Sequence, residues 1–471
     1  MVSVSGVRGI VGTDLTPETV ARYAAAFGAL LGSERWAPSV VVGRDARTSG
    51  TMFAAAVQAG LQSVGAGVID CGVVPTPTVQ LAVEHHRAAG GIVITASHNP
   101  IEWNALKFVG ADGIFLDADG GARLRDLVSS ERLPRSGWDG LGSVSTDPEA
   151  VARHVAGVLG LSVLDVEAIR RRRFAVALDC VRGAGGVIMP TLLEQFGCRV
   201  TGINLEPDGR FPRPPEPVPE NLGELEGLVR RSGADVGMAV DPDVDRLALV
   251  DETGTPIGED YTLAFAVRAV LGGSADGRVG GRSGSPAAQP PNRGPVVCNL
   301  STSLVVEDAA RDCGADVLRA PVGEAHVARA MVQARATIGG EGNGGVMLAA
   351  LHVGRDAPVA AALVLQLLAR TGQRVSQLVE SAPRYTIVKA KAPRGSELTQ
   401  SYGMLQKLRG ASVDRADGLR LAWSNPSRWL HVRPSGTEPI VRLIAEAPTE
   451  AEARALVGEA TNALDAARAR A

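Results

Sequence analysis

Short apolar runs that suit buried strands alternate with helix-like stretches through all but the last part of the chain. For example, apolar runs at residues 39–42 and 67–70 flank a segment at 50–62 with helical periodicity. Alternation of this kind is typical of βαβ units, in which helices join parallel strands. The pattern restarts near Phe174 and near Asp260. We therefore expect α/β units of similar size with mixed, mostly parallel sheets.

The pattern changes near Tyr385. Residues 385–391 read as an exposed alternating strand, and shorter runs at 419–423 and 429–432 suggest further strands. The Ala-rich, charged segment at 450–471 has helical periodicity. The end of the chain therefore predicts a smaller α+β domain.

Length and charge restrict the class of protein. A chain of 471 residues is too long for one core, so roughly three or four domains are expected. The net charge of −3 gives no overall basic field. Nucleic acid and anionic membrane are therefore not expected partners.

The five cysteines are far apart in sequence, odd in number and without a C-x-x-C pair, which favours free thiols in a reducing cytosol. The sequence shows no signal peptide and no apolar run of about 18 residues, so we expect a soluble cytoplasmic protein.

Residues 272–295 are rich in Gly, Ser and Pro. We interpret them as a flexible surface insertion rather than a functional lid.

A serine and a histidine follow the apolar run at 91–94, in the segment Thr-Ala-Ser-His-Asn-Pro at residues 95–100. Ser97 and His98 are thus expected in a loop outside the carboxyl end of a strand, where α/β proteins place reacting groups. A Ser-His pair alone is a weak signal, because most such pairs are solvated. Three more loops of phosphate-binding character downstream strengthen it.

The second loop reads Asp-Pro-Asp-Val-Asp-Arg at residues 241–246. Asp241, Asp243 and Asp245 converge on one cation if the loop curls, and oxygen-only ligands favour Mg²⁺. An Asp-rich turn that caps a helix is the alternative. Metal binding is the favoured interpretation because Arg246 and the upstream hydroxyl accompany the three acids.

The third loop, Gly-Gly-Glu-Gly-Asn-Gly-Gly at residues 339–345, carries one carboxylate and one amide. Glycine permits close approach of the backbone to a ligand. Glu341 and Asn343 offer paired hydrogen bonds that suit sugar hydroxyls. A structural turn would seldom need both polar groups.

The fourth loop reads Arg-Pro-Ser-Gly-Thr-Glu-Pro at residues 433–439. Arg433 is able to bind two phosphate oxygens, while Ser435, Thr437 and nearby N–H groups suit an anion. A β-turn shaped by Pro434 and Gly436 is an equally good interpretation of this loop alone.

Several basic residues lie near these loops in sequence. Arg8 is in a Gly-flanked segment, and Lys107 is close enough to Ser97 to share its site. Arg44 and Arg47 lie between a strand and a helix, and are interpreted as loop cations or ion-pair partners.

Taken together and in this order, the four loops resemble those of the α-D-phosphohexomutase family. The resemblance covers nearly the whole chain apart from the insertion. It implies four domains around a central cleft, three α/β and one smaller C-terminal domain, each of which contributes one loop. The limits we expect are residues 1–145, 146–256, 257–378 and 379–471.

The resemblance implies transfer of a phosphoryl group between the 1- and 6-positions of a hexose phosphate. Ser97 would be carried as phosphoserine, and its phosphoryl group would pass to the substrate to form a bisphosphorylated intermediate. That intermediate would reorient and return its other phosphoryl group to Ser97. A hexose 1,6-bisphosphate is the expected activator.

The resemblance also assigns roles to residues. Mg²⁺ would be bound by Ser97, Asp241, Asp243 and Asp245, with Arg246 offsetting further negative charge. Arg8 and Lys107 would lie near the reacting oxygens, Lys107 as a general acid or base with a lowered pKa, and His98 would orient the serine loop. Sugar hydroxyls would be bound by Glu341, Gly342 and Asn343, and the distal phosphate by Arg433, Ser435, Gly436 and Thr437.

The substrate is suggested by finer features of the third domain. Relatives specific for glucose or mannose phosphates have His where this chain has Gly345. The segment at 352–357 looks like that of archaeal-type phosphoglucosamine mutases, and the segment at 321–326 matches a substrate-facing part of the family, in which His326 is either a substrate contact or a surface histidine. We expect glucosamine phosphate, with mannose or glucose phosphate as the alternative.

Two other functions compete with a mutase. A phosphatase that uses a phosphoserine would not need loops that retain and reorient a sugar phosphate. A non-catalytic sugar-phosphate sensor would not need Ser97 and all three aspartates. The sequence is compatible with a monomer or a homodimer.

Overall fold

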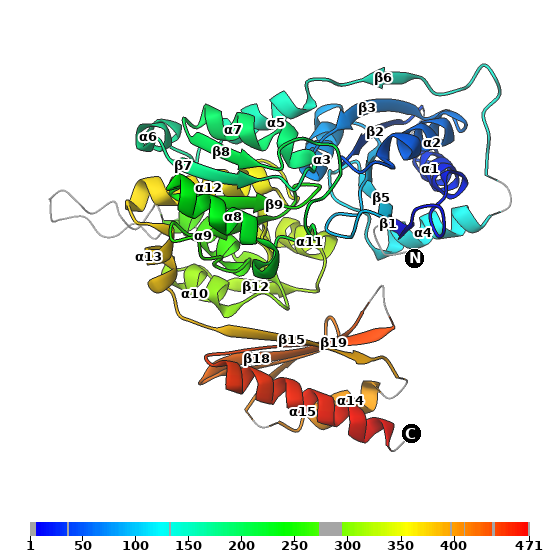
Figure 1. The fold of residues 1–471 in the computed structure, drawn as a ribbon. Coiled ribbons are helices and arrows are strands. Elements are labelled where there is room, and N and C mark those ends of the chain that lie inside the picture. The colour runs from blue at the N-terminus through cyan, green and yellow to red at the C-terminus, as the bar shows by residue number, and fades with distance from the viewer. Residues whose placement is uncertain are drawn as a thin grey trace, which may run out of the picture.

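The computed structural model describes residues 6–34, 37–130, 133–272, 294–395, 398–408, 410–435 and 439–469. It contains four β-sheets, each with its own helices, arranged in chain order (Figure 1). The expected architecture of three α/β domains and a C-terminal α+β domain is confirmed. Among the described residues, no helix combines the length and apolar character needed to cross a bilayer.

The first sheet has six strands, with helices on both of its faces. Its strands, in spatial order, are β1 (Gly6–Ile10), β5 (Trp103–Gly110), β4 (Gly90–Ile94), β2 (Ser39–Arg44), β3 (Gly67–Val73) and β6 (Val144–Thr146). Its helices are α1 (Pro17–Gly32), α2 (Gly50–Gln62), α3 (Thr76–His85) and α4 (Ala118–Ser129). One face buries Phe27, Phe53 and Phe108, and the other buries Val41 and Val93 against Val79 and Val83 of α3.

The second and third sheets have four strands each. In spatial order, the second contains β10 (Leu247–Val250), β9 (Val236–Val240), β7 (Ala175–Asp179) and β8 (Arg199–Ile203), with α5 (Ala150–Leu159), α6 (Val166–Arg172), α7 (Met189–Gln195) and α8 (Gly223–Ser232). The third contains β12 (Val317–Ala320), β11 (Val296–Asn299), β13 (Ile338–Glu341) and β14 (Gly345–Leu348), with α9 (Asp260–Leu271), α10 (Leu304–Asp312), α11 (Glu324–Ala334), α12 (Ala357–Thr371) and α13 (Val375–Glu380).

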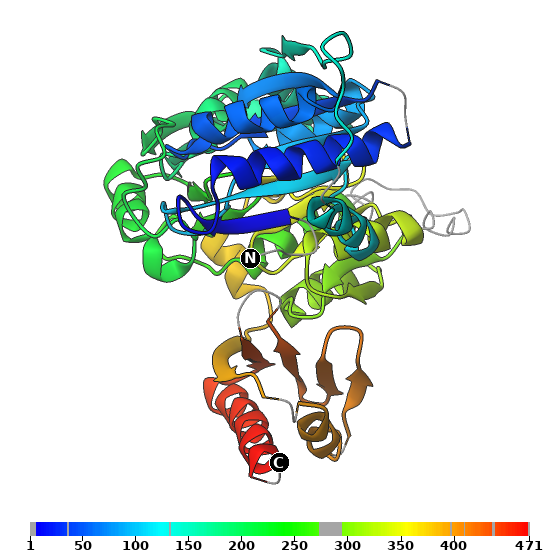
Figure 2. The same ribbon diagram turned by 90° about the vertical axis from the view of Figure 1, so that its right-hand side faces the viewer.

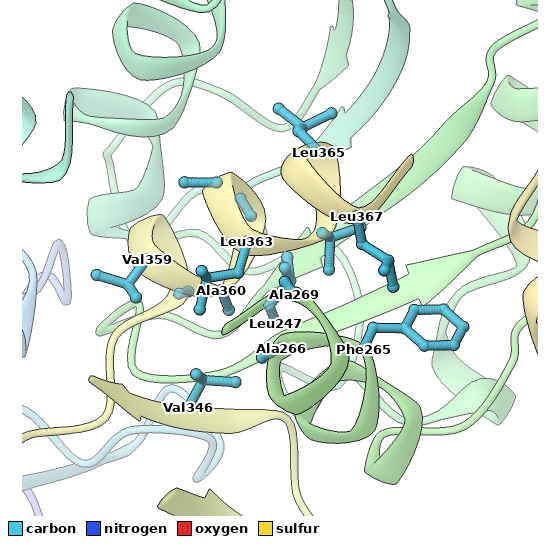
Figure 3. Packing of buried hydrophobic residues seen from close by; sticks show 14 of the residues in the cluster. Leu247, Phe265, Ala266, Ala269, Val346, Val359, Ala360, Leu363, Leu365 and Leu367 are labelled. Atoms are coloured by element: carbon cyan, nitrogen blue, oxygen red, sulfur yellow. The ribbon is translucent and has the colours of Figure 1, made fainter. Parts of the chain in front are cut away.

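One continuous core joins the second and third sheets. Helix α12 is apolar around nearly its whole circumference and packs against α9, α5 and α6. Figure 3 shows Leu363 and Leu367 of α12 beside Ala266 and Ala269 of α9. Because burial of apolar surface stabilises contact by about 25 cal/mol per Å², this shared core holds the two sheets in one relative position.

The C-terminal domain is a separate layer below the other three in the view of Figure 1. Its antiparallel strands, in spatial order, are β15 (Thr386–Pro393), β19 (Ile440–Ala447), β18 (Ser427–Pro434), β17 (Leu419–Ser424) and β16 (Ser412–Asp414). Helices α14 (Leu398–Leu405) and α15 (Glu450–Arg468) pack on the face turned away from the rest of the molecule (Figures 1 and 2). The opposite face of the sheet lies toward the third domain.

In the first three sheets an antiparallel strand follows each loop singled out in the sequence. The loop that contains Ser97, at residues 95–100 (the serine loop), joins β4 to β5. The loop at 241–246 (the metal loop) joins β9 to β10, and the loop at 339–345 (the sugar loop) joins β13 to β14, each pair of strands being antiparallel. The fourth loop, at 433–439 (the phosphate loop), joins β18 to β19, which are also antiparallel. The alternative of a helix-capping turn at residues 241–246 is therefore wrong, because the chain turns back into the sheet.

Candidate active site

A buried ion pair supports the backbone of the serine loop. Asp45 and Arg47 form this pair, with 3.0 Å between Nε of Arg47 and Oδ2 of Asp45. The Arg47 guanidinium donates hydrogen bonds of 2.6–2.9 Å to four backbone carbonyls, those of Ser97, Asn99, Pro100 and Trp103. Arg47 is therefore a structural partner of the loop, one of the two interpretations that the sequence left open.

The same pair determines the conformation of Ser97. Oγ1 of Thr95 donates to Asp45 at 2.6 Å and accepts from the Ser97 N–H at 2.9 Å. Ser97 has a φ of 49°, a left-handed conformation that costs energy for a residue other than glycine. Its side chain is buried, and its Oγ donates a 2.8 Å hydrogen bond to Oδ2 of Asp241. The first and second domains thus meet at the serine hydroxyl.

The three aspartates of the metal loop are buried together, with one oxygen of each within 4.8 Å of the others. Burial, together with the carboxylates of Asp245 and Asp243, raises the pKa of Asp241 well above its ordinary value. Burial acts in the same direction on Asp243, but the ammonium of Lys107 outweighs it and lowers the pKa of that carboxyl. The cluster therefore carries negative charge that a nearby cation stabilises.

Two oxygens of this cluster have no hydrogen-bond partner. Oδ1 of Asp243 and Oδ1 of Asp245 are both buried and accept no hydrogen bond from the described residues, although Nε of Arg246 lies 3.6 Å from Oδ1 of Asp245. A buried carboxylate oxygen left without a partner costs about 1–3 kcal/mol or more. Hard, oxygen-only donors of this kind fit a divalent cation such as Mg²⁺, with the Ser97 side chain beside them.

Lys107 lies inside the same cluster. Its Nζ donates to Oδ2 of Asp243 at 2.7 Å and is 3.7 Å from Oδ2 of Asp245. Burial alone lowers the pKa of Lys107, but the two carboxylates outweigh burial and raise it. The expected lowering of this pKa is therefore wrong, and Lys107 is an ammonium in this structure.

A histidine lies beside the serine hydroxyl, and two arginines lie close enough to act on that histidine. Arg8 donates to Oδ1 of Asn99 at 2.6 Å, and Arg246 donates to Glu216 at 3.2 Å. Nδ1 of His98 lies 3.4 Å from Oγ of Ser97. The Arg246 guanidinium, burial and Arg8 together lower the pKa of His98 well below its ordinary value, so its imidazole is neutral.

The sugar loop is more tightly bound within the protein than its sequence suggests. Glu341 is buried and accepts hydrogen bonds from Asn299 at 2.8 Å, Gly323 at 2.9 Å and Arg355 at 2.7 Å. Burial opposes ionisation, but Arg355 and these hydrogen bonds lower the pKa of Glu341. Glu341 is thus an ionised carboxylate that is already largely occupied by protein groups.

The remaining members of the sugar loop differ in exposure. Asn343 is half-buried, and its Oδ1 accepts from the Gly345 N–H at 3.2 Å. Gly342 has no room for a side chain, because a Cβ would lie 2.1 Å from Oδ1 of Asp260. Glycine at 342 therefore allows the loop to pack closely against α9, as well as allowing a ligand to approach the backbone.

The fourth loop is described only in part. Arg433 donates to Oδ2 of Asp417 at 2.7 Å, and Ser435 is buried, its N–H bonded to the Ile440 carbonyl at 2.8 Å. Gly436 and Thr437 lie outside the described residues. His326 is exposed on the first turn of α11, and no hydrogen bond of the described residues joins it to the other loops.

Comparison with known proteins identifies the family. Four models of the phosphoglucomutase/phosphomannomutase family match the chain in order: alpha/beta/alpha domain I at residues 2–135, domain II at 152–254, domain III at 284–385 and the C-terminal domain at 387–463. The chain belongs to this family, the α-D-phosphohexomutases. The family that the four loops suggested is thereby confirmed.

Individual relatives agree with the family models. A Thermococcus kodakarensis protein named phosphoglucomutase/phosphomannomutase is 38% identical over 454 residues, 95% of each chain. A Methanopyrus kandleri protein named probable phosphoglucosamine mutase is 36% identical, over 97% of this chain and 95% of its own. The structure of a phosphoglucomutase/phosphomannomutase family protein from Burkholderia thailandensis superposes with a TM-score of 0.84 at 25% identity, over 99% and 98% of the two chains.

These relationships establish the class of reaction. The protein is a phosphohexomutase, an isomerase that transfers a phosphoryl group within a hexose phosphate. The relatives' names restrict that activity to glucosamine phosphate or to glucose and mannose phosphates. A mutase is thus established over the sensor and phosphatase alternatives.

Sequence reasoning missed several residues of this phosphohexomutase's site. Asp45 and Arg355 were not singled out, although each lies in a loop just before a helix and is buried in the structure. Glu324, at the start of α11, lies within the segment at 321–326 and is also buried. The one available signal was charge: an Arg or Glu flanked by Gly at the end of an apolar run is a poor candidate for a simple solvated turn.

Proposed function

We propose that this phosphohexomutase works through a phosphoserine at Ser97 and prefers glucosamine phosphate. The observation that carries the mechanism is the 2.8 Å contact between Oγ of Ser97 and Oδ2 of Asp241, beside two buried, unpaired carboxylate oxygens. A serine hydroxyl and a cation-binding carboxylate cluster in contact are what transfer of a phosphoryl group to and from serine requires.

The proposed cation ligands are Asp241, Asp243 and Asp245, together with the Ser97 side chain. When bound there, Mg²⁺ would neutralise negative charge on the transferring phosphoryl group. The protein would contribute further positive charge from Arg8, Arg246 and Lys107. Most of the catalytic effect would then come from fixed charges and positions rather than from covalent chemistry.

In the proposed step a hydroxyl oxygen of the sugar phosphate attacks the phosphorus of phosphoserine. A bond forms between that oxygen and phosphorus, the bond from phosphorus to Oγ of Ser97 breaks, the sugar hydroxyl loses its proton and Oγ gains one. Lys107, as an ammonium, is able to donate a proton to the departing oxygen and afterwards to accept one. The reverse step on the reoriented bisphosphate regenerates phosphoserine.

The remaining loops would hold the sugar. Arg433, Ser435, Gly436 and Thr437 are proposed to bind the phosphate that does not react, at either end of the sugar. Asn343 is half-buried and available to a hydroxyl, whereas Glu341 would combine one sugar contact with its bonds to the protein. Reorientation requires that the loops bind both ends of the bisphosphate similarly, which phosphate recognition by the same arginine permits.

Glucosamine phosphate is favoured by the sugar loop and the segment at 352–357, and relatives named phosphoglucosamine mutase are consistent with it. Glucose or mannose phosphate is the second candidate, because a relative 38% identical carries the name phosphoglucomutase/phosphomannomutase. The two candidates differ in the group at position 2 of the sugar, an ammonium or a hydroxyl.

The test is mutase turnover with Mg²⁺ and a hexose 1,6-bisphosphate on glucosamine, glucose and mannose 1-phosphates. We expect the highest kcat/KM for glucosamine 1-phosphate. A higher value for either of the other sugars would overturn the preference while leaving the mechanism intact. Phosphopeptide mapping after exposure to the bisphosphate should place the phosphoryl group on Ser97, and a phosphate on another residue would overturn the mechanism.

A further inference from the structure

One arginine outside the four loops joins three buried carboxylates from three separate segments. Arg355 precedes α12 and is only 8% exposed. Its guanidinium donates to Oδ2 of Asp245 at 2.5 Å, to Oε2 of Glu341 at 2.7 Å and to Oε2 of Glu324 at 3.1 Å. The metal loop, the sugar loop and the start of α11 therefore meet at one planar cation.

The contact with Asp245 leaves the other oxygen of that carboxylate without a hydrogen bond, with only an ion-pair contact of 3.6 Å to Nε of Arg246. Arg355 binds Oδ2 of Asp245, while Oδ1 is buried without a hydrogen-bond partner. A carboxylate held at one oxygen by a guanidinium presents its second oxygen in a fixed direction. Groups that orient a ligand in this way influence metal affinity as strongly as many direct ligands do.

The segment that carries Arg355 is itself anchored, through Asp356, to α5 of the second domain. Oδ2 of Asp356 accepts from His154 at 2.8 Å and from His352 at 2.9 Å, and its Oδ1 caps α12 by accepting from the Val359 N–H at 2.9 Å. All three of these polar residues, Asp356, His154 and His352, are buried. The backbone at Arg355 is therefore held by the contacts of Asp356 as well as by the 3.3 Å hydrogen bond that the Arg355 N–H donates to Oε1 of Glu324.

The sugar loop makes room for this arginine. A Cβ on Gly345 would lie 2.3 Å from Cδ of Arg355, too close for any side chain, although Gly345 does not have a positive φ. The absence of a side chain at 345 is thus required by Arg355 and not by the backbone conformation. Gly345 and Arg355 form a matched pair.

We propose that Arg355 is a positioning residue that sets the spacing between the metal loop and the sugar loop and turns Oδ1 of Asp245 toward the cation. The inference rests on the proposed metal site. It assigns to the pair Gly345 and Arg355 a role in both cation binding and sugar alignment. A guanidinium suits this role because it bonds three carboxylates in one plane, which an ammonium does not.

The test begins with direct binding of Mg²⁺ to the full-length protein by titration calorimetry, without substrate. We expect Arg355→Met to weaken Mg²⁺ binding by about 10- to 100-fold and to lower kcat more than it raises KM for the sugar phosphate. Arg355→Lys should restore neither the Mg²⁺ affinity nor kcat to the wild-type value. Unchanged Mg²⁺ affinity in Arg355→Met would overturn the inference.

A matched control separates positioning from general destabilisation. Arg213 is also ion-paired and its side chain is 9% exposed, with Nε 2.8 Å from Oδ2 of Asp179. Arg213→Met should lower thermal stability and leave Mg²⁺ affinity as in the wild type. Equal loss of affinity in both variants would mean that Arg355 acts only through stability, and would overturn the proposal.

Gly345→Ala provides a variant that keeps the arginine and its charge. In the wild type we expect it to displace Arg355 and to reproduce most of the loss of Mg²⁺ affinity and kcat. In an Arg355→Ala background, which lacks the Cγ and Cδ atoms that the new Cβ would meet, it should add less than about twofold, because the clash is gone. Additive losses would overturn the pairing of the two residues.

Asp243→Asn distinguishes failure of this inference from failure of the proposed site. It removes a proposed ligand that does not contact Arg355, and should abolish Mg²⁺ binding. If it binds Mg²⁺ like the wild type, the metal site and the inference both fail. If it abolishes binding while Arg355→Met does not weaken it, only the inference fails.

Discussion

The serine loop and the phosphate loop are held by the protein in different ways. The serine loop lies over a buried arginine that donates to four of its carbonyls, and its hydroxyl contacts the metal loop of the second domain. The described part of the phosphate loop is held within its own domain, by Arg433 to Asp417 and by Ser435 to Ile440.

Within the part of the chain that the structure describes, hydrogen bonds between the C-terminal domain and the third domain are made by residues outside the fourth loop. They include bonds from His431 to Ser301, from Glu446 to the N-terminus of α10 and from the Val322 N–H to Asp417. The comparison teaches that Ser97, the proposed reacting group, is preorganised by neighbouring domains. The loop that is proposed to bind either end of the sugar bisphosphate is carried on a separate layer.

The largest expected effect is at the reacting group itself. Ser97→Ala should lower mutase kcat by roughly 10³-fold or more, because no other hydroxyl occupies the contact with Asp241. The fold should persist, since the carbonyls bound by Arg47 are unchanged. Turnover and thermal melting measured on one preparation test this. If the variant retains turnover, the proposed phosphoserine mechanism is wrong, and the serine loop does not differ from the phosphate loop in carrying the reacting group.

The next effect concerns the support of the serine loop. Arg47→Met leaves Asp45 as a buried charge without its partner, which costs about 3–5 kcal/mol in the free energy of unfolding. Turnover should fall with it, because the loop loses its carbonyl partners. Urea denaturation measures the stability change.

Arg44→Met is the matched control for Arg47. Arg44 is half-buried at the end of β2, and the one hydrogen bond of its side chain to the described residues is a 3.5 Å contact with the Asp45 carbonyl. Its loss should cost less than about 1 kcal/mol. Similar losses for the two variants would contradict the distinct role of Arg47.

Acidification should weaken the contact between the C-terminal domain and the third domain before it affects the serine loop. Burial lowers the pKa of His431 to about 4, while its neutral ring bonds Ser301 and the Asp417 carbonyl. The unfolded histidine has a pKa of about 6.5, so it binds a proton that the folded one excludes. This stabilisation is complete above pH 6.5 and is lost as pH falls toward 4.

The difference between the two pKa values corresponds to a total loss of about 3 kcal/mol, of which roughly 2 kcal/mol falls between pH 7 and pH 5. The measurement is urea denaturation at pH 7 and pH 5 for the wild type and for His431→Gln. The variant should lose less stability between these pH values than the wild type does. Parallel pH profiles would show that His431 does not govern this contact.

The smallest expected effect is at the insertion. Deletion of residues 273–293, which lie outside the described residues, should change stability by less than about 0.5 kcal/mol and leave turnover unchanged. Its Gly, Ser and Pro content gives it little apolar surface to bury. A large loss of turnover would mean that the insertion contributes to the active site, in addition to the serine loop and the phosphate loop.

Much of the fold was predictable from local patterns. The strands expected at 39–42 and 67–70 are β2 and β3, the helix expected at 50–62 is α2, and the C-terminal helix is α15. The antiparallel strands that follow the loops were not predicted. Strand β10 is four buried apolar residues, and such a run carries no information about the direction in which it pairs.

The candidate site was predictable where chemistry is concentrated in a short motif. Ser97 and the three aspartates stand in short segments with several polar groups, so their spacing alone suggested a reacting hydroxyl and a cation. Arg47 and Arg355 are single charged residues in loops, and their sequence context resembles that of any solvated cation. Their roles depend on partners 50 and 110 residues away, Ser97 and Asp245 respectively.

The sequence by itself determined the alternation of strands and helices, the four loops and the family, because these follow from short-range periodicity and from motifs a few residues long. The tertiary structure alone decided which oxygens remain unpaired, that Glu341 is held by the protein, that Lys107 keeps its proton and that Gly345 must lack a side chain. These properties depend on distances between segments that are far apart in the chain. Hydrogen bonding, desolvation and steric contact are set by such distances, and local sequence does not specify them.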